Sequence, residues 1–322
     1  MRSEVRDLPE LFLARLKKLV PAGKFDSIAN TFAEAKPTTF RVNTLKTTIS
    51  SVKNALERQN FSISAVSWFP SAFILKRGRQ KELEQTEIYL EGEIYLQNLS
   101  SMVPPLILDP KPGEMILDLT AAPGGKTTQI ACLMEGEGQI TANENDKIRF
   151  EKMKNNINLQ GASNVQLVLS YGESFGNKYP EQFDRVLVDA PCSAEGRFVA
   201  GQPASSRYCN LNKVKENAKL QKKLLMSGLK ALKPGGVLVY STCTFAPEEN
   251  EEVVDFVLQS SGGTIELEPC KLTIPNQIPG LSQWEGRRFH TSLSRTLRIL
   301  PTVEMEGFFA SKMRKNKELS KG

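Results

Sequence analysis

Two cysteines and an aspartate lie in positions that are typical of catalytic residues, just after predicted strands. Asp189 and Cys192 are in the segment VDAPCSAEGRF (188–198), and Cys243 is in YSTCTFAPEEN (240–250). Both segments begin as apolar runs that predict buried strands, so each cysteine follows the end of a strand. A buried cysteine usually acts as a small hydrophobic residue. Two such cysteines, one of them close to an aspartate, indicate a site instead.

Several kinds of thiol chemistry are open to these residues. The single histidine of the chain is far away in sequence, which argues against a cysteine–histidine pair of the protease type. A redox disulfide is conceivable, although the CxxC spacing is missing. A thiolate that adds to carbon 6 of a cytosine would make carbon 5 nucleophilic enough to accept a methyl group. An acid at ring nitrogen 3 would stabilise the developing charge, and the thiolate must later leave. This last reaction would use two thiols, for attack and release, and one carboxyl group, for charge stabilisation.

A parallel sheet would bring these residues together. Short apolar runs alternate with helical stretches over the later three quarters of the chain. The runs are 115–119, 139–144, 165–170, 185–191 and 236–242, and the helical stretches include 126–135, 147–160 and 212–232. Strands without alternation, each followed by a helix, predict an α/β fold with a mostly parallel, doubly wound sheet. Ligands of such sheets bind at the carboxyl ends of the strands.

The first of these strands leads into the segment DLTAAPGGKTTQIA (118–131), whose small residues suit a tight turn close to a ligand. A phosphate-binding P-loop would need a glycine where Thr120 stands, and the GxGxxG fingerprint is absent. The next strand ends in Glu144, which is well placed to bind the hydroxyls of a ribose. A nucleoside without a polyphosphate fits best, and S-adenosylmethionine is the common one.

The composition indicates the setting. A net charge of +6 favours an anionic partner, with nucleic acid as the leading candidate. The five cysteines are widely spaced, which predicts reduced thiols rather than a disulfide framework, and no spacing suggests a metal site. No apolar stretch approaches the roughly 18 residues that span a bilayer, and the N-terminus lacks the apolar core of a signal peptide. We expect a monomeric cytoplasmic protein with no membrane or metal partner.

Three parts of the chain are predicted. A leading helix at 8–20, a helix at 49–59 and strands at 62–69 and 72–76 form a small α+β module over residues 1–85. The parallel-sheet domain occupies residues 86–315, and a basic tail occupies residues 316–322.

The segments DLTAAPGGKT, DAPCSAEG and YSTCTFAPEENE are similar to three motifs of the RNA (cytosine-5) methyltransferase family. That family includes the RsmB- and RsmF-type ribosomal RNA enzymes and related tRNA enzymes. The similarity extends through YLQNLSSMVPPLIL (95–108) to EGFFASKMRK (306–315). It implies a Rossmann-like class I fold that forms 5-methylcytosine in rRNA or tRNA from S-adenosylmethionine, through a covalent cysteine–cytosine adduct. The small module would then be an RRM-like unit that positions RNA.

The resemblance also assigns roles to residues. It implies that Cys243 is the nucleophile, that Cys192 assists product release, and that Asp189 contacts the cytosine ring near the cofactor. Tyr171 stands where relatives have an aspartate that contacts adenine, which puts that contact in doubt. The cofactor-binding residues implied are Thr120, Ala121, Ala122, Pro123, Gly124, Gly125, Lys126, Glu144, Tyr171 and Asp189.

Some questions remain open from the sequence. A thiol redox protein on a nucleotide-binding sheet and a non-catalytic RNA-binding scaffold are the alternative functions. Lys126 could face the site or the solvent. Cys132 is expected in the core, and His290 is expected to be structural or an RNA contact. The proline and acidic residues after Cys243 predict a helix that begins near residue 247, with Glu248 and Glu249 in its first turn.

Overall fold

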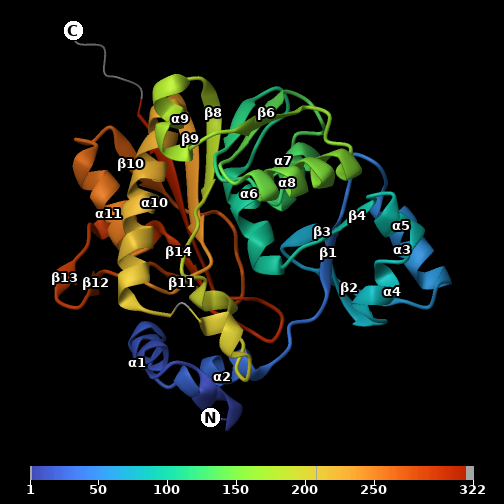
Figure 1. The fold of residues 1–322 in the computed structure, drawn as a ribbon, viewed down its shortest axis with the longest axis horizontal. Helices are drawn as coiled ribbons and strands as arrows, with labels where there is room; N and C mark the ends of the chain where they lie inside the picture. The colour runs from blue at the N-terminus through green and yellow to red at the C-terminus, as the bar shows by residue number, and fades with distance from the viewer. Residues whose placement is uncertain (1, 208, 317–322) are drawn as a thin grey trace.

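The computed structural model describes residues 2–207 and 209–316, which form a large sheet domain with a smaller sheet module beside it (Figure 1). Residues 317–322 of the predicted basic tail lie outside the described residues. Within the two described ranges, we find no helix with the length and apolar content needed to cross a bilayer. The same ranges hold no group of three or more side chains suited to bind a metal ion.

Five parallel strands form the part of the large sheet that carries the predicted site, which confirms the expected α/β fold. Their spatial order is β7–β6–β5–β8–β9. The strands are β5 (Met115–Asp118), β6 (Gln139–Glu144), β7 (Val165–Leu169), β8 (Phe183–Asp189) and β9 (Leu232–Thr242). Further strands extend the sheet beyond β9 in antiparallel pairs: β15 (Phe308–Lys315), β14 (Leu297–Ile299), β11 (Gln277–Pro279) and β10 (Ile265–Glu268). A short separate ribbon consists of β12 (Gln283–Trp284) and β13 (Arg287–Arg288).

Helices cover both faces of this sheet, so its central strands are buried on both sides. Leu238 and Tyr240 pack into one hydrophobic cluster and Val239 into the other. Burial of both faces explains why these strands have continuous apolar sequences. The helices of the domain are α6 (Val103–Leu108), α7 (Gly125–Leu133), α8 (Lys147–Gln160), α9 (Gly172–Lys178), α10 (Leu211–Ala231) and α11 (Glu251–Ser260).

The small module is a four-stranded antiparallel sheet with the order β2–β3–β1–β4. Its chain order, strand–helix–strand–strand–helix–strand, is that of a split βαβ fold. Because β4 pairs with β1, the sheet extends past the boundary expected at residue 85. The elements are β1 (Thr39–Val42), α3 (Ile49–Arg58), β2 (Ser62–Val66), β3 (Phe69–Arg77), α4 (Gln80–Leu83), α5 (Glu87–Leu90) and β4 (Ile94–Leu96).

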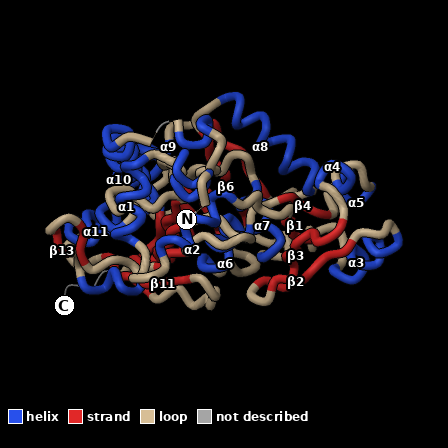
Figure 2. The backbone as a smooth tube through the Cα atoms, turned by 90° about the horizontal axis from the view of Figure 1, so that it is seen from below, coloured by secondary structure: helices blue, strands red, loops and turns tan. Residues whose placement is uncertain are grey.

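One face of the small sheet is covered by its own helices and the other by the large domain (Figure 2). Ala72 and Ile74 of β3 share a hydrophobic cluster with Met102 and Val103, which precede the first strand of the large domain. Arg41 of β1 is almost fully buried and donates to Thr128 Oγ1 at 2.6 Å and to the Gly125 carbonyl at 3.2 Å. The module is therefore docked against the start of α7 through its open sheet face.

The leading segment packs on the large domain rather than on the small sheet, with which the sequence had grouped it. It contains α1 (Glu10–Leu19) and α2 (Phe25–Asn30). The Phe12 ring of α1 lies 5.0 Å from the Phe198 ring and 6.3 Å from the Phe245 ring. These two partners lie on the segments that follow β8 and β9. The leading helices thus support both cysteine segments.

Candidate active site

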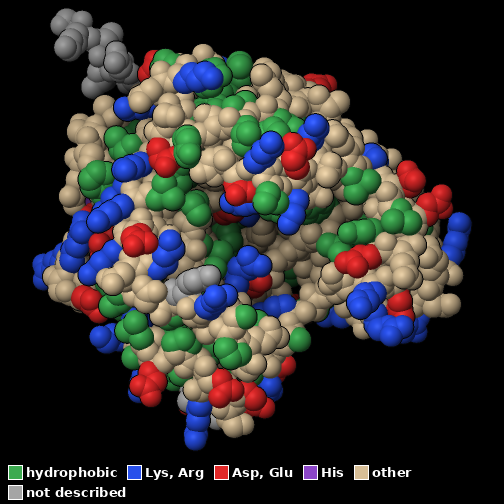
Figure 3. Space-filling model, in the orientation of Figure 1, with side chains coloured by type: hydrophobic (Ala, Val, Ile, Leu, Met, Phe, Trp, Pro, Cys, Tyr) green, Lys and Arg blue, Asp and Glu red, His purple; other side chains and the backbone are tan. Residues whose placement is uncertain are grey.

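A cavity of about 580 Å³ opens at the carboxyl ends of the parallel strands. Its size is that of a small-molecule site. The surface is hollowed between the small module and the large domain, with Lys and Arg side chains near the hollow (Figure 3). Tyr95 and Gln97, at the end of the small module, contribute to the lining. The sequence-predicted residues that line the cavity are Thr120, Ala121, Ala122, Pro123, Gly125, Lys126, Glu144, Asp189, Cys192 and Cys243.

The structure brings the two predicted cysteines into contact. Strands β8 and β9 are paired neighbours, and the Sγ atoms of Cys192 and Cys243 lie 3.3 Å apart. The pKa of the Cys192 thiol is raised well above its usual value, first by the hydrogen bond with Cys243, then by burial and by the nearby charge of Glu249. The two sulfurs are therefore close enough to share a proton.

Asp189 and Lys126 form an ion pair in the same cavity, with Nζ–Oδ2 at 2.7 Å. Asp189 also accepts from Ser241 Oγ at 2.7 Å, and Lys126 donates to Ser101 Oγ at 2.7 Å. The sequence left open whether Lys126 faces solvent. Its side chain is only 12% exposed and faces the site. A charge-assisted pair of this kind holds both side chains in a defined place.

The loop before α7 has the close-packed geometry that its small residues predict. Gly124 has φ +100, a conformation that side chains disfavour, and it does not line the cavity. A Cβ atom on Gly125 would lie 2.9 Å from the Tyr95 ring. Thr120 Oγ1 donates to the Asp189 carbonyl at 2.9 Å, which ties the loop to the end of β8. The backbone conformation of the loop therefore favours glycine at 124, and the close contact with Tyr95 favours glycine at 125.

Glu144 has the geometry expected of a group that holds a ribose. The residue is 3% exposed and lines the cavity. Its Oε1 accepts from the backbone N–H groups of Asn145 and Asp146 at 2.9 and 3.0 Å. Its Oε2 has no hydrogen-bond partner in the described chain, although Arg149 approaches to 3.4 Å. A buried acceptor at a cavity, with one oxygen that accepts no hydrogen bond, suits a hydroxyl ligand.

Asp118 is a cavity residue that sequence reasoning used only to mark a strand end. Burial raises its pKa to about 7, while a 2.7 Å hydrogen bond from Thr127 acts in the opposite direction. Its Oδ1 has no hydrogen-bond partner in the described chain. The signal that could have identified it is its position, because Asp118, Glu144 and Asp189 each close a parallel strand.

Tyr171 does not form part of the cavity wall. Its side chain is 70% exposed, and it does not line the cavity, whereas the next two residues, Gly172 and Glu173, do. His290 is also outside the cavity lining. It is exposed, and its Nδ1 contacts Ser292 Oγ at 2.7 Å at the start of a 3-10 helix. Cys132 is partly buried, and its Sγ lies 3.2 Å from Asn43 Oδ1 of the small module.

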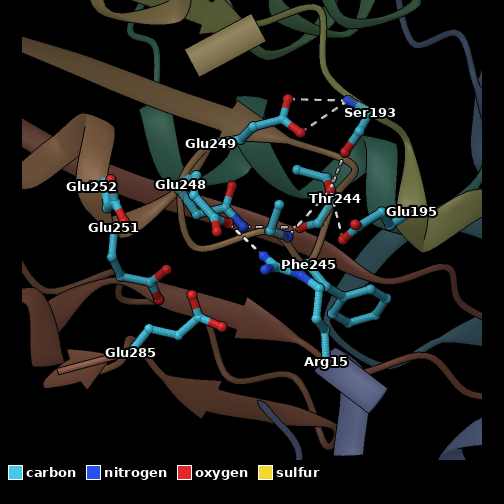
Figure 4. Close-up of polar contacts among 12 residues, drawn as sticks. Arg15, Ser193, Glu195, Thr244, Phe245, Glu248, Glu249, Glu251, Glu252 and Glu285 are labelled. Atoms are coloured by element: carbon cyan, nitrogen blue, oxygen red, sulfur yellow. Dashed lines mark hydrogen bonds and ion pairs between the residues drawn. The ribbon is translucent and has the colours of Figure 1, made fainter. Parts of the chain in front are cut away.

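The predicted helix start near residue 247 is wrong, because α11 begins at Glu251. Tertiary contacts hold the preceding residues in a turn. Glu248 accepts from Arg15 Nη2 at 2.5 Å, and Glu249 accepts from the Ser193 N–H at 3.0 and 3.2 Å (Figure 4). The Asn250 side chain donates to the Thr244 carbonyl at 2.9 Å. These contacts, rather than a helix terminus, account for the positions of the two acidic residues.

The chain is similar in sequence and fold to known methyltransferases. Residues 105–314 match the family model described as 16S rRNA methyltransferase RsmB/F, and residues 8–99 match the N-terminal domain of 16S rRNA methyltransferase RsmF. The chain is 38% identical to a tRNA (cytosine(49)-C(5))-methyltransferase of Pyrococcus abyssi, over 98% of each chain. It is 37% identical to ribosomal RNA small subunit methyltransferase F of Vibrio campbellii, over 96% of this chain but only 63% of that relative. A solved methyltransferase homolog from Pyrococcus horikoshii is 34% identical and covers 96% of this chain and 100% of its own, with a TM-score of 0.78.

Proposed function

We propose, since the chain belongs to the 16S rRNA methyltransferase RsmB/F family, that it methylates carbon 5 of a cytosine in RNA through covalent attack by Cys243. One observation carries the proposal: two thiols 3.3 Å apart share a cavity with an aspartate–lysine pair. Attack by a thiolate on carbon 6 of the ring is the route by which a cytosine becomes able to accept a methyl group at carbon 5.

S-adenosylmethionine is the cofactor, and it supplies the methyl group. The residues present fit it. The loop from Thr120 to Lys126 leaves room along the cavity wall, and Glu144 Oε2, which accepts no hydrogen bond in the described chain, suits the ribose hydroxyls. Tyr171 is exposed and does not line the cavity, although the adjacent Gly172 and Glu173 do, so its contact with adenine stays a prediction.

Side chains of the protein carry out attack on the ring, stabilisation of its charge and release of the product. Cys243 forms the bond to carbon 6. Asp189, fixed by Lys126 and Ser241, holds the ring and stabilises the charge that builds at nitrogen 3. Cys192 lies 3.3 Å from the Cys243 sulfur, and its own thiol pKa is raised by the hydrogen bond with Cys243. In the final step the proton on carbon 5 is lost to solvent, its electron pair restores the 5,6 double bond, and the bond from carbon 6 to the Cys243 sulfur breaks. Cys192 donates its proton to that sulfur.

The small module does not bind RNA in the way that an isolated RRM does. An RRM stacks bases on the open face of its sheet, but here that face is buried against the large domain through Arg41 and Ile74. We propose that the module shapes the cofactor cavity through Tyr95 and Gln97 and borders the hollow that receives RNA.

The preferred substrate is transfer RNA. The support for this proposal is the tRNA-named relative of Pyrococcus abyssi, which is 38% identical over 98% of this chain. We further propose that the protein acts as a monomer in the cytoplasm.

The test is methylation of unmodified tRNA and 16S rRNA with labelled S-adenosylmethionine, followed by bisulfite sequencing of the products. We expect label in tRNA at a cytosine, and none with Cys243→Ala. Label in rRNA alone would contradict the choice of substrate. Calorimetric titration that finds no binding of S-adenosylmethionine would favour a non-catalytic RNA-binding scaffold.

A further inference from the structure

Glu249 is a buried acid whose position the proposed chemistry does not explain. The residue is fully buried on the turn after Cys243. In the part of the chain that the structure describes, the hydrogen bonds to its carboxylate come from neutral donors and no ion pair reaches it. A buried carboxylate without a cation costs free energy, so the contacts it makes must account for its place in the fold.

Those contacts lead to the segment that carries Cys192. Both carboxylate oxygens accept from the Ser193 N–H, at 3.0 and 3.2 Å, and Gln221 of α10 donates to Oε2 at 2.7 Å. The same Gln221 amide donates to the Pro191 carbonyl at 2.9 Å. The residues on both sides of Cys192 are thus held by one carboxylate and one amide.

The segment needs such support because of its backbone shape. Ala194, two residues after Cys192, has φ 55 and ψ 30. Residues with a side chain rarely adopt this left-handed region, and they persist there when surrounding contacts hold them. Figure 4 shows the Glu249 carboxylate directed at the Ser193 N–H from the neighbouring segment.

We propose that Glu249 is a positioning residue that holds Cys192 beside Cys243 for the release step, an inference that rests on the proposed function. It acts through the Ser193 N–H and does not touch the substrate. Its loss leaves Cys243 able to attack carbon 6, but the donor for the departing sulfur is displaced.

The test measures the covalent RNA–protein complex on a denaturing gel together with turnover. In Glu249→Ala we expect the fraction of trapped complex to rise about tenfold, as for loss of a hydrogen bond to a charged group, while turnover falls. Glu249→Gln keeps an acceptor for the Ser193 N–H and should restore release. The matched control is Glu248→Ala, which removes the neighbouring acid that binds Arg15, and its trapped fraction should equal that of the wild type.

A second measurement is independent of RNA and of whether Glu249→Ala folds. In a Cys243→Ala background, Glu249→Asp keeps a negative charge near Cys192 but withdraws the carboxylate from the Ser193 N–H. Alkylation of Cys192 by iodoacetamide at pH 8.5 should therefore accelerate several-fold. An unchanged rate would overturn the inference.

Failure of the inference and failure of the proposed function look different. A Cys243-dependent complex that Glu249→Ala does not enrich overturns only the role of Glu249. A complex that persists in Cys243→Ala, or the absence of any complex in the wild type and in Cys192→Ala, overturns the proposed function itself.

Discussion

The segments that carry the two cysteines follow neighbouring strands but are stabilised in different ways. The segment after Cys243 has several hydrogen bonds among its own residues. Asn250 bonds the Thr242 hydroxyl and the Thr244 carbonyl at 2.5 and 2.9 Å, and the Glu249 N–H donates to the Ala246 carbonyl at 3.0 Å. Although Arg15 and Ser193 also contact this segment, its internal hydrogen bonds fix the turn, and we call it the self-supported segment.

The segment after Asp189 depends on contacts from elsewhere. The Gly196 N–H donates to the Cys243 carbonyl at 2.9 Å, and Ser193 Oγ lies 2.7 Å from Thr244 Oγ1. Glu249 and Gln221 supply the remaining support. The difference suggests a division of roles: the nucleophile is on the self-supported segment, and the thiol that assists release is on the segment that the first one positions.

The largest effect should come from the nucleophile. Cys243→Ala removes the group that bonds to carbon 6, so the rate of methylation should fall by roughly three orders of magnitude or more, as for loss of other enzymatic nucleophiles. Single-turnover assays with labelled S-adenosylmethionine measure this. Activity within tenfold of the wild type would contradict the assignment.

Cys192→Ala should have a smaller effect on turnover and none on attack. Loss of one proton-transfer group typically lowers a rate by about 100-fold or more. Steady-state turnover should fall by that amount, while a first covalent attachment to RNA still forms. Serine at the same position is the matched control, because its hydroxyl can still donate a proton. Equal losses of attachment in both cysteine variants would break the proposed division.

Asn250→Ala tests the self-supported segment. It removes two buried hydrogen bonds, which should lower the free energy of unfolding by about 2 kcal/mol. Because the disturbed segment carries the nucleophile, attack should slow and the trapped complex should not accumulate. Urea denaturation and the gel assay together check this. If the trapped RNA–protein complex accumulated as expected for Glu249→Ala, the two segments would not have the different roles proposed here.

The remaining prediction is a pH dependence of stability. Burial raises the pKa of Glu249 to about 7 from an ordinary value of 4.5. A raised folded pKa gives stability that is present below the unfolded pKa and is lost as pH rises through the folded one. The wild type should therefore lose up to roughly 3 kcal/mol relative to Glu249→Gln between pH 4.5 and 8. Urea denaturation at both pH values measures this, and a constant difference would contradict it.

The sequence was sufficient for the features that depend on local pattern. Continuous apolar strands predicted the parallel sheet, and motif positions at the strand ends predicted that Cys192 and Cys243 would share a cavity. The small residues of the loop before α7 predicted its tight turn. These features follow from residue type and chain order alone.

The features that depend on contacts between distant segments were not predictable in the same way. The helix expected at 247 is replaced by a turn, because Glu248 and Glu249 bind Arg15 and Ser193. The leading helix was grouped with the small module, yet Phe12 packs near Phe198 and Phe245. Local propensity gives no signal for partners that are separated by scores of residues.

The central claim is that Cys243 attacks and Cys192 releases. Its most direct test is a denaturing gel of substrate RNA incubated with S-adenosylmethionine and the wild type, Cys192→Ala, Cys243→Ala or the double variant. We predict a covalent RNA–protein band that is strong in Cys192→Ala and absent from both proteins that lack Cys243. A strong band in Cys243→Ala that disappears in the double variant would show that the two roles are reversed.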